Sequence, residues 1–141
     1  MARLNANPQA EASVDFPVIK PCVTRLRVKA IITQAEDGGP LVSAKGNTYW
    51  KIQLEYVDPT SLTKEDGSPV TGPVGSIFDN SIVVAPAEKQ GKARGFVEAL
   101  GAAWADLDSE DLVGLECDAR IGIEEYQGNK KNTVARYLKK Q

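Results

Sequence analysis

The segment 24–57 constrains the fold most, because it contains two runs in which apolar and polar residues alternate. Apolar residues occupy every second position over Leu26–Ile32 and again over Trp50–Tyr56. Successive side chains of a β-strand point to opposite faces of a sheet, so each run predicts a strand with one buried face. A glycine-rich stretch at 36–47 predicts a long loop between the two strands.

The outer face of this predicted strand pair combines cations with an aromatic residue. Its members are Arg25, Arg27, Lys29, Tyr49 and Lys51. Cations that contact phosphates and aromatic rings that stack on bases are typical of surfaces that bind single-stranded nucleic acid. The pattern is also typical of a solvated strand face, in which Arg27 would pair with Glu55 across the strands.

Three more strands and one helix are predicted after residue 57. Pro86 suits the first turn of a helix, and apolar residues recur at helical spacing after it, at Phe96, Val97, Leu100 and Trp104. The predicted strands are 22–35, 48–57, 75–84, 113–126 and 132–139, and the predicted helix is 87–104. Three strands, a helix and two strands is the layout of the OB-fold. The sequence therefore predicts a mainly β protein, a five-stranded OB-fold barrel with one helix between the third and fourth strands.

The length of 141 residues predicts one domain, preceded by an arm. Residues 1–21 have no periodicity and contain three prolines, so they predict an extended N-terminal arm. Residues 22–141 are predicted to form the OB-fold domain. Within the arm, Phe16, Val18 and Ile19 are expected to pack on the barrel or on a neighbouring subunit.

Charge is unevenly distributed along a chain whose net charge is -2. Residues 105–126 are strongly acidic, whereas residues 127–141 contain five Lys or Arg residues and no Asp or Glu. This segregation predicts basic and acidic surfaces on different sides of the protein. The sequence shows neither a signal-peptide pattern nor an apolar stretch of bilayer length, so we expect a cytoplasmic protein that does not enter a membrane.

Missing residue types exclude several kinds of chemistry. The chain has no histidine, which excludes zinc sites that need histidine and Ser-His-Asp catalysis. Its two cysteines, Cys22 and Cys117, are too few for a metal site made of cysteines alone, and Cys117 is predicted to lie in the core. The paired carboxylates at 108–111 and 124–125 have no phosphate-binding glycine loop or nucleophile–base pair near them. We therefore expect no enzymatic activity, no cofactor and no metal site.

Five segments carry a further signal through their order and spacing: Lys45–Ile52, Gly75–Asn80, Phe96–Gly101, Asp111–Cys117 and Glu125–Leu138. Together they resemble segments of small phage single-stranded-DNA-binding proteins. The last of these, E-Y-Q-G-N-K-K-N-T-V-A-R-Y-L, is similar to the E-Y-N-G-K-x-x-N-x-V-x-x-Y-L ending of those proteins. The resemblance covers about 45–138, and the first predicted strand more loosely.

The resemblance implies a non-catalytic role in phage DNA replication, recombination and repair. A protein of this kind coats single-stranded DNA largely without sequence specificity, in the cytoplasm of the infected bacterial host, and can meet replication or recombination proteins. This chain departs from the pattern at its basic end, Tyr137–Gln141, where many phage proteins of this function have an acidic tail that recruits partners. A homodimer formed through exposed strand edges is a further possibility for an open barrel.

The expected DNA path crosses the second and third strands, between the loops at 36–47 and 127–132. Tyr49 and Tyr126 are candidates for base stacking, and Phe78 joins them although its face is not decided by the alternation. Trp50 and Tyr56 are predicted to lie in the core. The candidate phosphate contacts are Arg25, Arg27, Lys29, Lys45, Lys51, Lys130 and Lys131. The alternative is an OB-fold module that binds a protein and no nucleic acid, with the outer aromatic residues as interface anchors.

Overall fold

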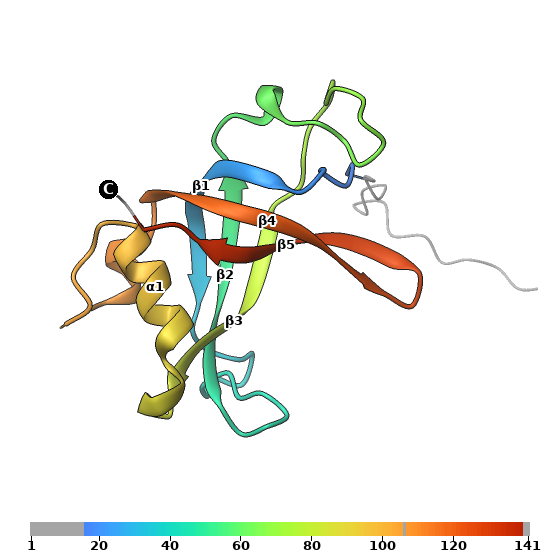
Figure 1. Ribbon diagram of the computed structural model, residues 1–141. Helices are drawn as coiled ribbons and strands as arrows, with labels where there is room; N and C mark the ends of the chain where they lie inside the picture. Colours follow the sequence, from blue (N-terminus) through green and yellow to red (C-terminus); the bar gives the residue numbers. More distant parts are fainter. Residues whose placement is uncertain (1–15, 106, 140–141) are drawn as a thin grey trace, which may run out of the picture.

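The computed structural model describes residues 16–105 and 107–139, which form a mainly β protein with five antiparallel strands in one sheet and one α-helix (Figure 1). The strands are β1 (Cys22–Ile32), β2 (Thr48–Tyr56), β3 (Ile77–Ala85), β4 (Glu116–Tyr126) and β5 (Asn129–Tyr137). Helix α1 (Gly91–Ala99) lies between β3 and β4 in the chain. Short 3-10 turns occupy Pro59–Ser61, Ala87–Lys89 and Ser109–Leu112. The predicted number and order of the strands and the position of the helix are confirmed.

The strand order across the sheet is β3-β2-β1-β4-β5, so β3 and β5 are the two edge strands. The sheet curls, and β4 and β5 cross β1 and β2 steeply in the view of Figure 1. We call the line along which β3 and β5 face each other the seam. Across it, the Tyr137 hydroxyl donates a hydrogen bond of 2.6 Å to Asp79 Oδ2. In the described part of the chain no backbone ladder joins the two edge strands, so the sheet is open there.

A β-bulge in β1 changes which side chains face the core. The register between β1 and β2 shifts between Val28 and Ala30. An extra residue in one strand reverses the alternation beyond it. Ile31 therefore packs against the core, whereas Ile32 is 39% exposed. The alternation predicted Ile32 on the buried face, and that prediction is wrong because a sequence pattern does not show the bulge.

The helix is shorter than predicted but presents the predicted face. Phe96, Val97 and Leu100 are buried, and the Phe96 ring lies 4.8 Å from the Tyr137 ring, centroid to centroid. The last helical residue is Ala99, and Gly101 has a φ of 80°, a left-handed conformation that glycine adopts readily and that ends helices. Trp104 consequently lies beyond the helix, where it packs partly buried against the core.

The hairpin between β4 and β5 is tighter than predicted. Tyr126 pairs with Asn129, and only Gln127 and Gly128 connect the two strands. Both connecting residues have positive φ, 51° and 82°, which is the geometry of a two-residue type I′ turn. The fifth strand therefore begins at Asn129 rather than at residue 132, so the lysines at 130 and 131 lie on a strand and not in a flexible turn.

The first described residues are fixed to the body of the protein. Ile19 is 1% exposed, and the Asn132 side chain bonds both of its backbone groups: Ile19 N–H donates to Asn132 Oδ1 at 2.9 Å, and Asn132 Nδ2 donates to the Ile19 carbonyl at 2.8 Å. The Asn132 side-chain amide thus forms the two hydrogen bonds that a neighbouring strand would otherwise form with the backbone of Ile19. Residues 1–15 of the predicted arm lie outside the described residues.

Candidate nucleic-acid interface

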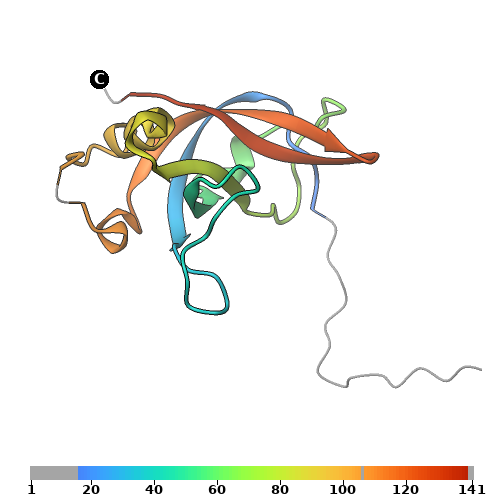
Figure 2. The same cartoon turned by 90° about the horizontal axis from the view of Figure 1, so that it is seen from below.

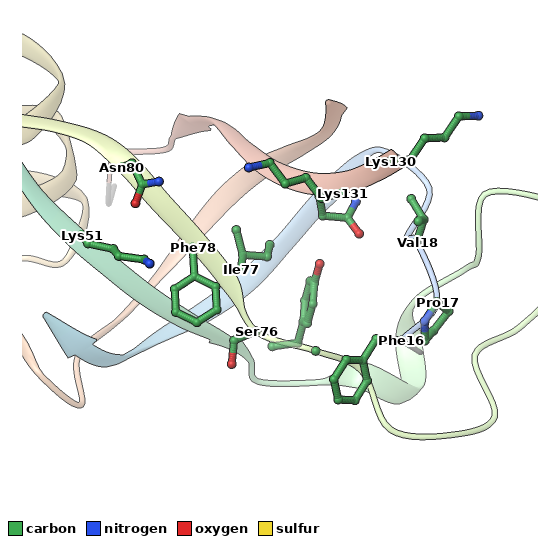
Figure 3. A pocket seen from close by; sticks show the side chains of 13 residues that line it. Phe16, Pro17, Val18, Lys51, Ser76, Ile77, Phe78, Asn80, Lys130 and Lys131 are labelled. Atoms are coloured by element: carbon green, nitrogen blue, oxygen red, sulfur yellow. The ribbon is translucent and has the colours of Figure 1, made fainter. Parts of the chain in front are cut away.

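A groove of about 380 Å³ lies in the open part of the seam, between the beginning of β3 and the beginning of β5 (Figure 3). We call it the seam groove, and its principal side chains are Lys51, Tyr56, Phe78, Asn80, Lys130 and Lys131. Figure 2 shows the same edge of the sheet from below, with the β4–β5 hairpin extending past β3. Among the described residues that line the groove there are three lysines and no Asp or Glu.

One wall of the groove carries an exposed aromatic ring covered by a cation. Phe78 is 45% exposed, and Lys51 Nζ lies 5.0 Å from the centroid of its ring (Figure 3). The two residues meet because Phe78 pairs with Gln53, so that Lys51, two residues along β2, is its diagonal neighbour on the same face. An ammonium group at this distance is attracted by the ring electrons. The ring therefore presents a flat surface that a base could use once the ammonium moves.

The other wall is the beginning of β5, where both lysines have exposed acidic partners. Lys130 extends away from the groove in Figure 3, and its Nζ donates to Glu65 Oε1 at 2.7 Å. This hydrogen bond and the charge of Glu65 raise the pKa of Lys130. Lys131 Nζ lies 3.8 Å from Glu124 Oε2, with both side chains more than half exposed. Exposed ion pairs of this kind stabilise a fold little, so both ammonium groups can exchange these partners for phosphates.

The floor of the groove contains a buried tyrosine. Tyr56 is 8% exposed, as the alternation of β2 predicted, and burial raises the pKa of its hydroxyl. Its hydroxyl oxygen is buried and has no hydrogen-bond partner among the described residues. Ile77, 2% exposed, is the other buried residue of the floor. The floor is therefore apolar except for one hydroxyl group.

One end of the groove is closed by the first described residues. Phe16, Pro17 and Val18 all line it. Phe16 lies directly over Gly75, where a Cβ atom would be only 2.8 Å from Phe16 Cδ2. Any side chain at Gly75 would push the ring away, so this glycine allows the close approach that shapes the end of the groove.

The two arginines of β1 lie elsewhere, in a set of ion pairs on the outer face of the sheet. Arg27 Nη2 lies 2.8 Å from Glu116 Oε2, and Arg27 Nη1 lies 3.4 Å from Glu55 Oε1. Arg25 Nε lies 3.2 Å from Asp118 Oδ1. The hydrogen bond that the Arg27 guanidinium donates to Glu116 is the main cause that raises the pKa of Arg27. We call these five residues the arginine cluster. The cross-strand pair of Arg27 with Glu55, the alternative weighed from the sequence, is present.

The remaining candidate residues lie outside the lining of the seam groove. Tyr49 is half-buried on β2 opposite Val83, and Tyr126 is 71% exposed at the end of β4. Lys29 is exposed on β1, and Lys45 is exposed in the loop before β2. Of the ten candidates, the structure thus brings together four: Lys51, Phe78, Lys130 and Lys131.

The sequence interpretation assigned no role in the site to Tyr56, Asn80 or Phe16, although all three line the groove. The alternation correctly predicted that Tyr56 is buried, but burial alone does not show whether its hydroxyl has a hydrogen-bond partner. Phe16 lies in a stretch without periodicity, so no local pattern indicated its position. Asn80 had no usable signal in the sequence, because the alternation left the face of Phe78 undecided; in the structure both residues are exposed on the same face of β3.

Other kinds of site are not evident in the described residues. No group of three or more His, Cys, Asp or Glu residues among them could hold a metal ion. None of the helices in residues 16–105 and 107–139 has the length and apolar character needed to cross a membrane. Cys117 is buried, as predicted, and burial raises the pKa of its thiol to about 11.

The chain was compared with protein-family models and with curated proteins. No protein-family model matches the chain, and no curated protein matches it. The seam groove and the charges around it therefore carry the functional argument.

Proposed function

We propose that this protein binds single-stranded DNA through the seam groove and the adjoining face of β2 and β3, and that it coats the strand largely without sequence specificity. The observation that carries the proposal is the described lining of the groove, which contains three lysines and an exposed phenylalanine and no acidic residue, in a chain of net charge -2. Cations and an aromatic surface in one groove are the two elements that nonspecific binding of a single strand requires.

The architecture supports the same proposal. We interpret the curled sheet as an OB-fold barrel that is incompletely closed between β3 and β5. The observed strand order and the helix between β3 and β4 fit this interpretation. OB-folds bind oligonucleotides across their second and third strands and the neighbouring loops. In this protein β3 forms one wall of the seam groove and β5 the other.

The chemistry of the groove predicts how the binding would depend on salt and sequence. The lysine ammonium groups would contact phosphates, which carry no sequence information. Release of counterions from a single strand gives a slope of about -0.7 per phosphate contact when log K is plotted against log salt, so three contacts give about -2. A base stacked on Phe78 would add roughly 1–3 kcal/mol whatever its identity.

The biological setting of the proposal comes from the resemblance to phage proteins. We place the binding in phage DNA replication, recombination and repair, in the cytoplasm of the infected bacterial host. Replication or recombination proteins and a second copy of the chain are the partners that this role suggests. In such a role the protein has no catalytic activity and needs no cofactor.

A second candidate function, binding of a protein partner, is favoured by a separate apolar hollow. This hollow of about 190 Å³ is lined mostly by apolar residues, among them Trp50, Ile82, Trp104 and Leu107, and Gln90 is the polar residue of its described lining. Large aromatic side chains around an apolar cavity are frequent anchors of protein interfaces. The hollow contains no Lys or Arg in its described lining, so it suits a peptide side chain better than a nucleotide.

The deciding experiment is fluorescence anisotropy of a labelled oligo-dT strand titrated with the protein at low and high salt, with duplex DNA as competitor. We expect binding that weakens with salt with a slope near -2 and that survives competition by duplex. Absence of binding at low salt would overturn the proposal and leave protein binding as the better candidate.

A further inference from the structure

We infer that the seam groove accommodates one base of the bound strand and that the Tyr56 hydroxyl forms a hydrogen bond with the edge of that base. This inference rests on the proposed binding of single-stranded DNA and specifies how the groove takes part in it. It concerns a contact deep in the groove, beyond the lysines and Phe78 at its walls.

The first argument is the unusual state of the hydroxyl. Buried polar atoms in proteins nearly always have a hydrogen-bond partner, and each exception calls for an explanation. Among the described residues, the Tyr56 hydroxyl is the one buried polar side-chain atom without a partner. Tyr137, buried to the same degree at 7% exposed, has its hydroxyl bonded to Asp79. The fold thus supplies a partner for one buried tyrosine and leaves the other unpaired beside a groove.

The second argument distinguishes a base from a phosphate as the occupant. The floor of the groove consists of Ile77 and the Tyr56 ring, without a charged group. A phosphate would be costly to bury against such a floor, because a buried charge needs an opposite charge nearby. A base is uncharged and flat, and its edge carries both donors and acceptors. The Tyr56 hydroxyl, kept protonated and neutral by burial, can serve either as a donor or as an acceptor.

The third argument is the shape of the site. The cavity of about 380 Å³ lies within the size range of small-molecule sites in proteins. Phe16 closes one end of it, and the double hydrogen bond between Ile19 and Asn132 holds the chain beside that end. The base would therefore enter from the side of Phe78, with the lysines left at the rim for the flanking phosphates. Because the hydroxyl is covered in the free protein, a neighbouring side chain must move when the base enters.

The experiment compares two labelled strands of equal length and charge, oligo-dT and a strand of abasic tetrahydrofuran units, for three proteins: wild type, Tyr56→Phe and Tyr137→Phe. We expect Tyr56→Phe to weaken binding of oligo-dT by about threefold to tenfold and to leave binding of the abasic strand unchanged. We expect it to fold normally, because it removes only the unpaired hydroxyl. Tyr137→Phe deletes a paired hydroxyl of a residue that does not line the groove, so it should lower thermal stability and change the affinity for neither strand.

A second measurement uses the wild-type sequence labelled with 3-fluorotyrosine and keeps the inference testable if Tyr56→Phe does not fold. The ¹⁹F resonance of Tyr56 should shift on addition of oligo-dT and stay in place on addition of the abasic strand. The base contact would be overturned if Tyr56→Phe bound oligo-dT with wild-type affinity, or if the Tyr56 resonance did not shift on addition of oligo-dT. Neither result would contradict DNA binding itself. Failure of wild-type protein to bind either strand at low salt would instead overturn the proposed function.

Discussion

The arginine cluster and the seam groove both bring cations together on one sheet, yet they differ in what surrounds each cation. Arg27 lies on β1, a central strand, with Glu55 opposite it on β2 and Glu116 opposite it on β4. Phe78, which Lys51 covers, lies on β3, an edge strand with a neighbour on one side only. A central strand gives a cation two neighbouring strands that can supply carboxylates, whereas an edge strand leaves one side open. Cations near an open edge are therefore better placed to bind an external anion.

The largest expected effect is the loss of the groove lysines. Changing Lys51, Lys130 and Lys131 together to Gln should weaken binding of oligo-dT at low salt by about 100-fold, since three charge-assisted contacts to phosphates are removed. The slope of log K against log salt should fall toward zero. Anisotropy titrations at several salt concentrations measure both quantities. The matched control changes the exposed Lys20, Lys89 and Lys139 to Gln. An equal loss of affinity in the control would mean that overall charge, and not the groove, binds the strand.

The next effect concerns the aromatic wall of the groove. Phe78→Ala should weaken binding of oligo-dT by about tenfold, because the mutation removes the surface on which a base stacks. The free energy of unfolding should change little, since Phe78 is 45% exposed. Titration at high salt gives the clearest measurement, because phosphate contacts are then weak. Affinity within twofold of wild type would show that the ring does not contact a base.

A smaller effect of opposite sign is expected from Glu65, which competes with phosphates for Lys130. Glu65→Gln removes the carboxylate that lies 2.7 Å from Lys130 Nζ. Oligo-dT should bind about twofold to threefold more tightly at low salt and equally at high salt, because the gain is electrostatic. Glu88→Gln, an equal change of charge outside the groove lining, is the control. If both variants gain equally, Lys130 is not a contact of the strand.

The smallest effect on binding is expected from the arginine cluster itself. Arg25→Gln combined with Arg27→Gln should leave the affinity for oligo-dT within about twofold of wild type, because carboxylates already pair with these side chains. The free energy of unfolding should fall only slightly, since both side chains are more than one-third exposed and exposed ion pairs stabilise a fold little. Chemical denaturation measures the second quantity. A tenfold loss of affinity would place the DNA over β1 and contradict the comparison drawn above.

The strands, the helix and most of the core could be predicted from the sequence, because these features depend on local periodicity. Leu26, Val28, Ile52 and Leu54 alternate in the chain and are all buried in the structure. Features that depend on pairing between strands could not be obtained in this way. The bulge that turns Ile32 outward is one example, and it arises from the register of β1 against β2.

The kinds of residue in the candidate site could be predicted from the sequence, but which particular residues form it could not. Alternation placed Arg27 and Lys51 on one outer face, and nothing local separates them. Their difference comes from Glu116, which is 89 residues from Arg27 in the chain and reaches it only through the pairing of β1 with β4. The Tyr56 hydroxyl likewise has no hydrogen-bond partner among the described residues, and this depends on how the whole chain folds around it, which no local pattern shows.

The hydrogen bond between Tyr137 and Asp79 also has a consequence for how the protein folds and unfolds. It joins residues 58 positions apart in the chain and the two outermost strands of the sheet. Contacts of such separation are costly in chain entropy and tend to form after local hairpins. A bond absent from the folding transition state affects the rate of unfolding and hardly the rate of folding. Loss of this one hydroxyl should therefore shorten the lifetime of the native state, a change that stopped-flow unfolding would detect while refolding keeps its normal rate.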